Sequence, residues 1–354
     1  FNLGIMYRNI GLIELSIKSH IEILEEDQFN ANCYYELSTM YNFSNHKKKL
    51  KTLLNIEIEN LPPKEKIYFC YSKANIYHQC KDYKKSTYFL KIANEEKLKI
   101  HPSDIKTKLN TGEYYRNLRI GKTVKIEREI GSNRYLFIVG MPRCGSTLLE
   151  SILSLNNKVK DLGEVFFLEE SLQKADNLLE VKKLYAEKVK VFNSEKKIFT
   201  DKNLFNFLYC PIIYNLFPNA RIIHCTRNPL DNILSIYRTN FLNQSFSSSL
   251  KDITDLYLYH LKLMHEYKSK FGSIIYSYEH DKVIQNPKET IQDLINWLEW
   301  EWNDKYLSPQ KSKRSVFTAS SAQVRKKINS HSSGYWKNYN DFLKPVSKLF
   351  PTYN

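Results

Sequence analysis

Gly140-Met-Pro-Arg-Cys-Gly-Ser-Thr147 lies between the apolar run Tyr135–Val139 and an amphipathic stretch that begins at Leu148. This order predicts a buried strand, a glycine loop and a helix. A loop of this kind directs backbone N–H groups and a helix N-terminus toward one point, where they can hold phosphate groups. The sequence therefore predicts an anion site at the carboxyl end of a strand in an α/β sheet.

The loop differs from a kinase-type P-loop at its most important cation. Ser146 stands where a P-loop has Lys, and Arg143 supplies a positive charge earlier in the loop. The missing Lys argues against γ-phosphoryl transfer assisted by Lys and Mg²⁺. We expect the loop to hold a different anionic group.

Composition sets wider limits. A chain of 354 residues is long enough for about two domains. Its formal net charge of +15 predicts anionic partners or substrates, although charge alone does not choose among nucleic acid, membrane surface, glycan and nucleotide. No run of about 18 apolar residues occurs, so no transmembrane segment is expected.

The six cysteines form no CxxC pair and no cluster with histidines at metal spacing, so no metal site is expected. Most of them lie in apolar or aromatic runs, which favours reduced thiols and a cytoplasmic location. One or two disulfides in a secreted chain remain the alternative. The chain starts at Phe1 without a Met, so a targeting segment before it also stays open.

Three segments near the N-terminus share a register. Gly11–Ser16, Asn45–Leu50 and Lys81–Ser86 start 34 and then 36 residues apart. A period near 34 residues is typical of tetratricopeptide repeats, in which stacked helix pairs bury a common core. We expect an all-α helical-repeat domain over residues 1–110, with an ordinary helical bundle as the alternative.

The rest of the chain, residues 111–354, alternates buried apolar runs with helical patterns. This alternation predicts an α/β domain with a P-loop-like parallel sheet flanked by helices. The expected strands are Tyr135–Val139, Lys197–Thr200, Arg221–Thr226 and Ser273–Tyr278, and the clearest expected helices are Leu204–Phe217 and Ile253–Phe271.

A second anion site is predicted where the strand Arg221–Thr226 ends. Arg227 follows this strand, and Ser235 lies eight residues farther on, in the helix that Pro229 begins. The Arg could bind a phosphate through two hydrogen bonds and the Ser could add a hydroxyl donor. A purely structural Arg-x-Pro turn is the alternative interpretation.

Taken together, these segments resemble the sulfotransferases that use 3′-phosphoadenosine 5′-phosphosulfate (PAPS). They are most similar to the tetratricopeptide-repeat sulfotransferases, which are relatives of the tyrosylprotein sulfotransferases. The resemblance extends from about Tyr135 to Tyr339 and rests on Gly140–Glu150, Thr200–Phe207, Arg221–Tyr237, Tyr276–Glu279 with Asn286-Pro287, and Thr318–Ile328 before Trp336.

The resemblance implies a role for each matching residue. Loop residues would hold the 5′-phosphosulfate of PAPS, while Arg227 and Ser235 would hold its 3′-phosphate. Tyr278 would border the adenine, and Ser321 and Lys326 would belong to a segment that closes over the donor. The loop residues concerned are Arg143, Cys144, Gly145, Ser146 and Thr147.

The resemblance also implies catalytic residues. Glu164 would be the general base, and Lys202 and Arg143 would stabilise charge on the transferred and leaving groups, without a metal. From its position alone, Glu164 could equally be a helix N-terminal residue favoured by the helix dipole.

The expected function is therefore PAPS-dependent sulfonyl transfer to a hydroxyl acceptor, such as a protein tyrosine, an acidic peptide or a glycan. A P-loop kinase and a non-catalytic scaffold with tetratricopeptide repeats remain alternatives. No nucleic-acid-binding module is recognised. The sequence leaves open the acceptor, a homodimeric state, and whether the repeats bind substrate or only brace the catalytic domain.

Overall fold

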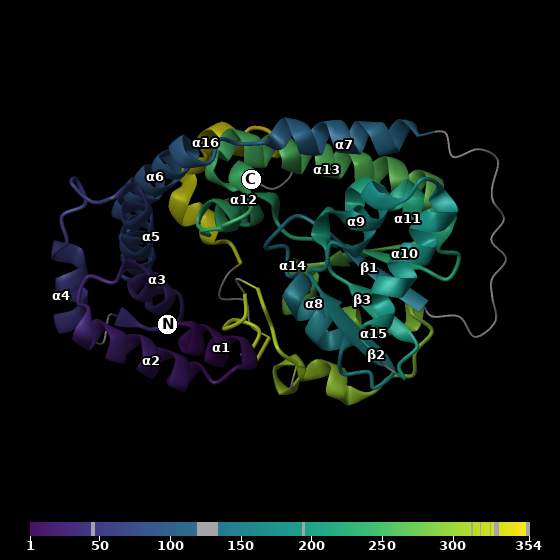
Figure 1. Cartoon of the computed structure of the whole chain (residues 1–354), viewed down its shortest axis with the longest axis horizontal. Helices are drawn as coiled ribbons and strands as arrows, with labels where there is room; N and C mark the ends of the chain where they lie inside the picture. Colours follow the sequence, from purple (N-terminus) through teal and green to yellow (C-terminus); the bar gives the residue numbers. More distant parts are fainter. Residues whose placement is uncertain are drawn as a thin grey trace.

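The N-terminal part of the computed structural model is built from helix pairs (Figure 1). The structure describes residues 1–43, 47–118, 134–192, 195–312, 314–318, 320–325, 327–328 and 333–351, with the side chains of residues 47–50 excepted. The helices of this first part are α1 (Asn2–Ile10), α2 (Ile13–Glu26), α3 (Ala31–Met40), α4 (Lys47–Asn55), α5 (Pro63–Gln79) and α6 (Tyr83–Ile100).

Two of the segments that share a register in the sequence contain turns between paired helices. Gly11 ends α1 with φ of 90°, and Lys81 separates α5 from α6 with φ of 61°. The left-handed backbone reverses the chain at both positions. The third segment begins within residues 44–46, which lie outside the described residues. The described helices thus confirm a helical N-terminal part, and its assignment as tetratricopeptide repeats stays a prediction.

The second part contains a parallel sheet, as expected. In the described residues it has five strands in the order β2-β3-β1-β4-β5, and every neighbouring pair is parallel. The strands are β1 (Arg134–Gly140), β2 (Val159–Gly163), β3 (Ile198–Asp201), β4 (Arg221–Thr226) and β5 (Ile275–Glu279). The sequence analysis missed β2, because Val-Lys-Asp-Leu-Gly is a short edge strand with two polar residues.

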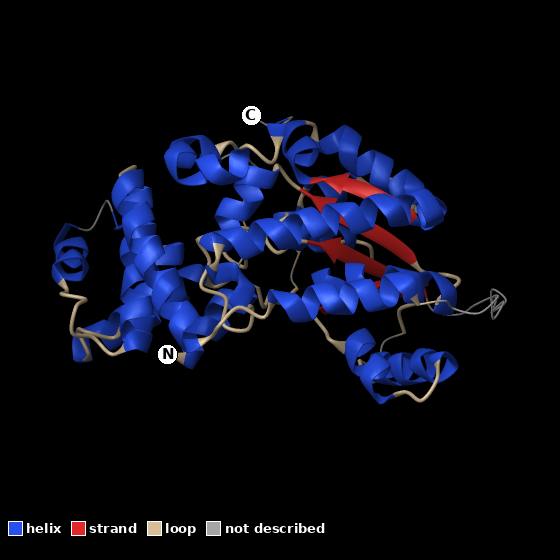
Figure 2. Cartoon of the chain, turned by 90° about the horizontal axis from the view of Figure 1, so that it is seen from above, coloured by secondary structure: helices blue, strands red, loops and turns tan. Residues whose placement is uncertain are grey.

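Helices cover both faces of the sheet (Figure 2). Alternate residues of β1 enter two cores, with Leu136 and Ile138 on one face and Phe137 and Val139 on the other. The helices of this part are α8 (Ser146–Leu153), α9 (Phe167–Lys174), α10 (Leu178–Lys190), α11 (Cys210–Leu216), α12 (Pro229–Tyr237), α13 (Leu250–Phe271), α14 (His280–Gln285), α15 (Pro287–Trp297) and α16 (Asn340–Ser347).

Short 3₁₀ helices supplement these elements. The region expected as one helix from Leu204 to Phe217 contains the 3₁₀ helix η2 followed by α11. The 3₁₀ segments are η2 (Leu204–Tyr209), η3 (Ser245–Ser248), η4 (Gly272–Ile274), η5 (Asp304–Leu307), η6 (Pro309–Lys311) and η7 (Tyr335–Tyr339).

Helix α7 (Ile105–Asn117) connects the two parts, and it lies along α13 (Figure 1). Its Arg116 donates two hydrogen bonds of 2.8 Å to the carboxylate of Glu266 on α13. The domain boundary expected near residue 110 thus falls inside a helix that already packs on the α/β part.

The C-terminal segment returns to helices α1–α6, which we call the repeat helices after the period in their sequence. The Tyr339 hydroxyl lies 2.9 Å from both Nδ1 of His78 on α5 and Oγ of Ser86 on α6. All six cysteines are free, and five of them are buried, Cys80 being exposed. Among the described helices, none combines the length and apolar character that a bilayer-spanning segment requires.

Candidate functional site

The glycine loop connects β1 to α8 and adopts a conformation that requires glycine. Gly145 caps α8 with φ of 95°, and a Cβ there would lie 2.3 Å from Nδ1 of His280. The loop is also held from two sides. Asn232 of α12 donates a 2.7 Å hydrogen bond to the carbonyl of Pro142, and the Cys225 thiol of β4 donates to the carbonyl of Cys144 at 3.2 Å. The loop is therefore a preformed anion cradle.

Arg143 lies at the centre of the site. Its φ of 68° is unusual for a residue with a side chain, and it turns the guanidinium toward α12 and the C-terminal segment. The guanidinium donates to Ser235 Oγ and Gln323 Oε1, each at 3.1 Å, and to Ser320 Oγ. Burial and the charge of Arg227 lower the pKa of Arg143 to about 10. A bound anion would relieve both unfavourable effects.

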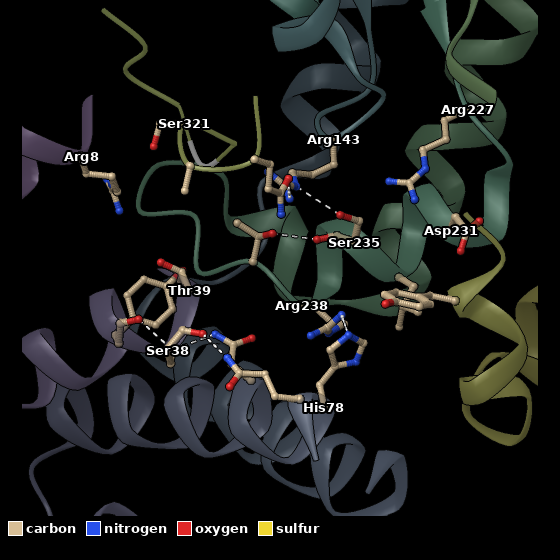
Figure 3. Close-up of a pocket in the computed structure, with 18 residues that line it drawn as sticks. Arg8, Ser38, Thr39, His78, Arg143, Arg227, Asp231, Ser235, Arg238 and Ser321 are labelled. Carbon is tan, nitrogen blue, oxygen red and sulfur yellow. Dashed lines mark hydrogen bonds between the residues drawn. The ribbon is translucent and has the colours of Figure 1, made fainter. Parts of the chain in front are cut away.

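A first cavity, of about 290 Å³, lies between the repeat helices and α12 (Figure 3). We call it the arginine cavity, because Arg8, Arg143, Arg227 and Arg238 line it together with Ser235 and Ser321. The Asp231 carboxylate in its wall already accepts hydrogen bonds from the backbone N–H groups of Gly334 and Trp336. The charge of this cavity therefore suits an anion.

The repeat helices position one of these arginines. His78 of α5 accepts a 3.2 Å hydrogen bond at Nε2 from Arg238, while its Nδ1 faces the Tyr339 hydroxyl. Burial and the nearby charge of Arg238 lower the pKa of His78 to about 3. A neutral imidazole can accept the hydrogen bond without repelling the guanidinium.

A second cavity, of about 130 Å³, lies on another side of Arg143. We call it the phenylalanine cavity, because Phe166, Phe205 and Phe241 line it with Leu204. Its remaining walls include the loop residues Gly145, Ser146 and Thr147, the carboxylate residue Glu164, and Lys108 of α7.

A third cavity, of about 260 Å³, lies beside Arg227 and the glycine loop. We call it the outer cavity. Arg143, Gly145 and Thr147 belong to its wall. The apolar side chains that line it are Leu148, Ile284, Val324 and Ile328.

Glu164 and Lys202 meet where β2 and β3 end. Lys202 Nζ donates a 2.6 Å hydrogen bond to Oε1 of Glu164. The Lys202 side chain is fully buried, whereas 48% of the Glu164 side chain is exposed. The backbone N–H of Lys202 also donates to the carbonyl of Gly163 at 2.9 Å, so the sheet fixes both residues. A carboxylate open to a substrate is thus paired with a cation that solvent cannot reach.

A second buried ion pair supports Lys202, and the sequence analysis missed it. Glu150 of α8 is fully buried, with Oε2 3.9 Å from Lys202 Nζ and 2.7 Å from the guanidinium of Arg314. Arg314 also lies 3.1 Å from Asp161 of β2. The only local signal was an acidic residue on the apolar side of α8, because Arg314 is 164 residues away in the chain.

Asp201, the residue before Lys202, accepts three hydrogen bonds of 3.0 Å from Tyr185, Asn203 and Asn206. Burial raises its pKa to about 7, against the lowering effect of these hydrogen bonds. Asp201 therefore anchors the chain between β3 and η2, which fixes the backbone position of Lys202.

The structure brings most of the predicted site residues together. Thr147 Oγ1 lies 3.2 Å from Thr318 Oγ1, so the segment that contains Ser321 reaches the glycine loop. Arg227 and Ser235 share the arginine cavity with Arg143. Cys144 is fully buried behind the loop, and its backbone carbonyl accepts the hydrogen bond from the Cys225 thiol.

Two predicted residues stand apart. Tyr278 is fully buried in the core that contains Ile138 and Leu149, because alternate residues of β5 point to opposite faces of the sheet. Tyr278 is not among the residues that line the three cavities, and its place beside the adenine stays a prediction. Lys326 lies outside the described residues. Across the described part, no group of three or more His, Cys, Asp or Glu side chains is arranged to hold a metal ion.

One known family model matches a part of the chain that includes some of the residues described above. Residues 167–304 match the model of the Sulfotransferase family. The matched region contains Lys202, Arg227 and Ser235, whereas the glycine loop and Glu164 precede it. The predicted parallel sheet flanked by helices is confirmed by the strand order of this chain.

One relative matches most of this chain. An uncharacterized protein of Aquifex aeolicus (strain VF5) is 30% identical over 337 residues, which covers 85% of this chain and 43% of that relative. The chain thus spans less than half the length of this relative.

Solved structures with some similarity are sulfotransferases. The sulfotransferase domain of the Synechococcus PCC 7002 olefin synthase is 16% identical, with a TM-score of 0.45 over 60% of this chain and 90% of its own. Sulfotransferase STF9 of Mycobacterium avium is 10% identical, with a TM-score of 0.39 over 90% of this chain and 96% of its own.

Proposed function

We propose that this protein is a sulfotransferase that moves the sulfonyl group of PAPS to a hydroxyl of an acceptor. The observation that carries the proposal is the 2.6 Å contact of Glu164 with the buried Lys202, beside a glycine loop that has Arg143 and no Lys. This arrangement supplies a proton acceptor, a cation and a preformed anion cradle in one place. The match of residues 167–304 to the Sulfotransferase family supports it.

The residues around Arg143 fit each part of the donor. The glycine loop and Arg143 would hold the 5′-phosphosulfate, and Arg227 and Ser235 in the arginine cavity would hold the 3′-phosphate. The outer cavity has about 260 Å³ of space, and its wall combines apolar side chains with polar ones, which suits the adenosine. Its position beside Arg227 links it to both phosphate sites.

Transfer follows from this placement. Glu164 accepts the proton of the acceptor hydroxyl while the hydroxyl oxygen attacks sulfur in line with the bond from sulfur to the phosphate oxygen. That bond breaks as the new oxygen–sulfur bond forms. The products are a sulfate ester and 3′-phosphoadenosine 5′-phosphate, and the proton leaves Glu164 to solvent. Arg143, Lys202 and the loop N–H groups stabilise the charge on the departing phosphate oxygen.

Lys202 also controls the base. Without donor, its ammonium is held by Glu164 at 2.6 Å and faces Glu150 at 3.9 Å. The sulfonate oxygens of the donor compete for this ammonium, which frees the Glu164 carboxylate for the acceptor. Glu150 remains as the buried counterion. We further interpret α1–α6 as tetratricopeptide-type repeats that border the donor site through His78 and Arg8.

Calorimetric titration tests the proposal. Wild-type protein and the Arg227→Ala variant would be titrated with 3′-phosphoadenosine 5′-phosphate and with 5′-AMP, which lacks the 3′-phosphate. We expect wild type to bind the first nucleotide more tightly by at least about tenfold, and the variant to lose this preference, because Arg227 forms the charge-assisted contact. Equal binding of both nucleotides, or no binding, would overturn the assignment and favour a non-catalytic scaffold.

A further inference from the structure

The phenylalanine cavity has the walls of a site for an apolar ring. Three of its side chains are Phe166, Phe205 and Phe241, and Leu204 adds a fourth apolar group. Phe205 is itself held in place, with its ring 5.9 Å from the fully buried Phe246 in an edge-on contact. Polar side chains such as Asn203, Asn243 and Gln244 also line the cavity. The three phenylalanine rings nevertheless favour a ligand with an aromatic ring, which gains from stacked and edge-on contacts as well as from burial.

The size of the cavity limits what enters it. Its volume is about 130 Å³, and an apolar protein cavity of about 150 Å³ binds one benzene molecule. The glycine loop and Glu164 form part of the wall, so a hydroxyl on such a ring can meet the base. The space suits a single six-membered ring.

Lys108 gives this cavity a cation of its own. It reaches the cavity from α7, and its ammonium lies 3.9 Å from the centre of the Phe205 ring and 6.0 Å from that of Phe246. Contact with two aromatic rings keeps the ammonium against the cavity wall. Burial lowers the pKa of Lys108, while Asp104 and Glu169 act on it as nearby charges. A ligand carboxylate at this position would offset the cost of burying the ammonium.

We propose that the acceptor is a hydroxyaryl carboxylate, whose single ring occupies the phenylalanine cavity, with its hydroxyl at Glu164 and its carboxylate at Lys108. This inference rests on the proposed sulfonyl transfer and deepens it by naming the acceptor class. Lys108 is a specificity-determining residue in this view, since it touches the ring substituent and takes no part in bond making.

Steady-state kinetics test the acceptor class. Wild-type protein with saturating PAPS would be given 4-hydroxyphenylacetate, 4-methylphenol or methyl glucoside, and formation of 3′-phosphoadenosine 5′-phosphate would be followed by chromatography. We expect kcat/KM for 4-hydroxyphenylacetate to exceed that for 4-methylphenol by about tenfold, the factor that one charge-assisted hydrogen bond supplies. Methyl glucoside should give no product above background.

Three variants assign this preference to one side chain. Lys108→Met should bring the ratio of the two kcat/KM values close to one, and Lys108→Arg should restore it. Lys106→Met, an exposed residue on the same helix, should keep the wild-type ratio. Thermal melting and nucleotide affinity of each variant would show that Lys108→Met is folded.

Results that contradict the acceptor class differ from results that contradict the sulfotransferase assignment. Preference for methyl glucoside, or a ratio that Lys108→Met leaves unchanged, overturns the acceptor class. If nucleotide binding depends on the 3′-phosphate but none of the three acceptors is used, the acceptor class fails while the sulfotransferase assignment stands. If nucleotide binding shows no such dependence, the sulfotransferase assignment itself fails.

Discussion

The arginine cavity and the phenylalanine cavity share Arg143 but differ in almost everything else. The first has four arginines in its wall and lies against the repeat helices (Figure 3). The second has three phenylalanines and lies against loops of the α/β part, with α7 at its edge. One loop thus borders a strongly cationic space and a mainly apolar space.

Under the proposed function, this difference separates two substrates. A nucleotide with several phosphate charges would be attracted to the arginines, whereas the ring of the acceptor would gain from burial among phenylalanines and its single carboxylate would meet Lys108. The repeat helices contribute Arg8 and His78 to the cationic side only. We infer that the repeats border the donor rather than the acceptor.

Replacing the base should produce the largest effect. Glu164→Gln keeps the size of the side chain but removes the proton acceptor, so we expect kcat to fall by about 10²- to 10⁴-fold. Initial rates of sulfonyl transfer would measure this, and affinity for 3′-phosphoadenosine 5′-phosphate should be retained. Glu187→Gln on the exposed face of α10 is the matched control. A variant that keeps more than about a tenth of wild-type kcat would rule out this role.

Removing Glu150, the buried carboxylate beside Lys202, should have the second largest effect. Glu150→Gln leaves Arg314 and Lys202 with one carboxylate fewer, and breaking a buried pair costs about 3 kcal/mol in the free energy of unfolding. Urea denaturation would measure it. Glu170→Gln breaks a surface pair with Lys188 at 2.5 Å and should cost less than about 1 kcal/mol. Equal losses in the two variants would contradict the support given to Lys202.

These predictions separate what the sequence could indicate from what it could not. The glycine loop and Arg227 with Ser235 were predictable, because each is a local pattern at a strand end. The buried ion pair of Glu150 and Arg314 beside Lys202 was not predictable, since these two residues meet only through tertiary packing. The phenylalanine cavity was equally hidden, because its rings come from three separate segments of the chain.

The elements of the fold also differ in how well the sequence predicted them. Central strands such as β1 and β4 were predicted almost to the residue, because most of their residues are buried and each contains a run of apolar side chains. The edge strand β2 was missed. The full burial of Tyr278 was not predictable either, since a motif match does not say to which face of β5 a side chain points.

Ser235→Ala should have a smaller effect, confined to the arginine cavity. The change removes a hydroxyl that contacts Arg143 at 3.1 Å and that we expect to contact the 3′-phosphate. Affinity for 3′-phosphoadenosine 5′-phosphate should fall by about tenfold in calorimetry, while the acceptor KM stays the same. Ser273→Ala, at an exposed position, should change neither. A change confined to the acceptor KM would reverse the assignment of the cavities.

A last prediction concerns the pH dependence of stability and involves neither donor nor acceptor. The pKa of His78 is about 3 in the folded protein and about 6.5 when unfolded, so the unfolded state binds more protons between these values. The resulting stabilisation is complete above about pH 6.5 and is lost as the pH falls toward 3. Wild type should therefore lose about 2 kcal/mol more than His78→Gln between pH 7 and pH 5 in urea denaturation. Parallel pH profiles of the two proteins would show that His78 is not buried as a neutral ring.

Donor and acceptor KM values in Arg227→Ala and Phe241→Ala test the division of the two cavities most directly. Both would be measured with PAPS and 4-hydroxyphenylacetate. We predict that Arg227→Ala raises the donor KM by at least about tenfold and leaves the acceptor KM within about twofold, while Phe241→Ala does the opposite. If both variants raise both KM values equally, or if the effects are exchanged, the two cavities do not divide donor from acceptor.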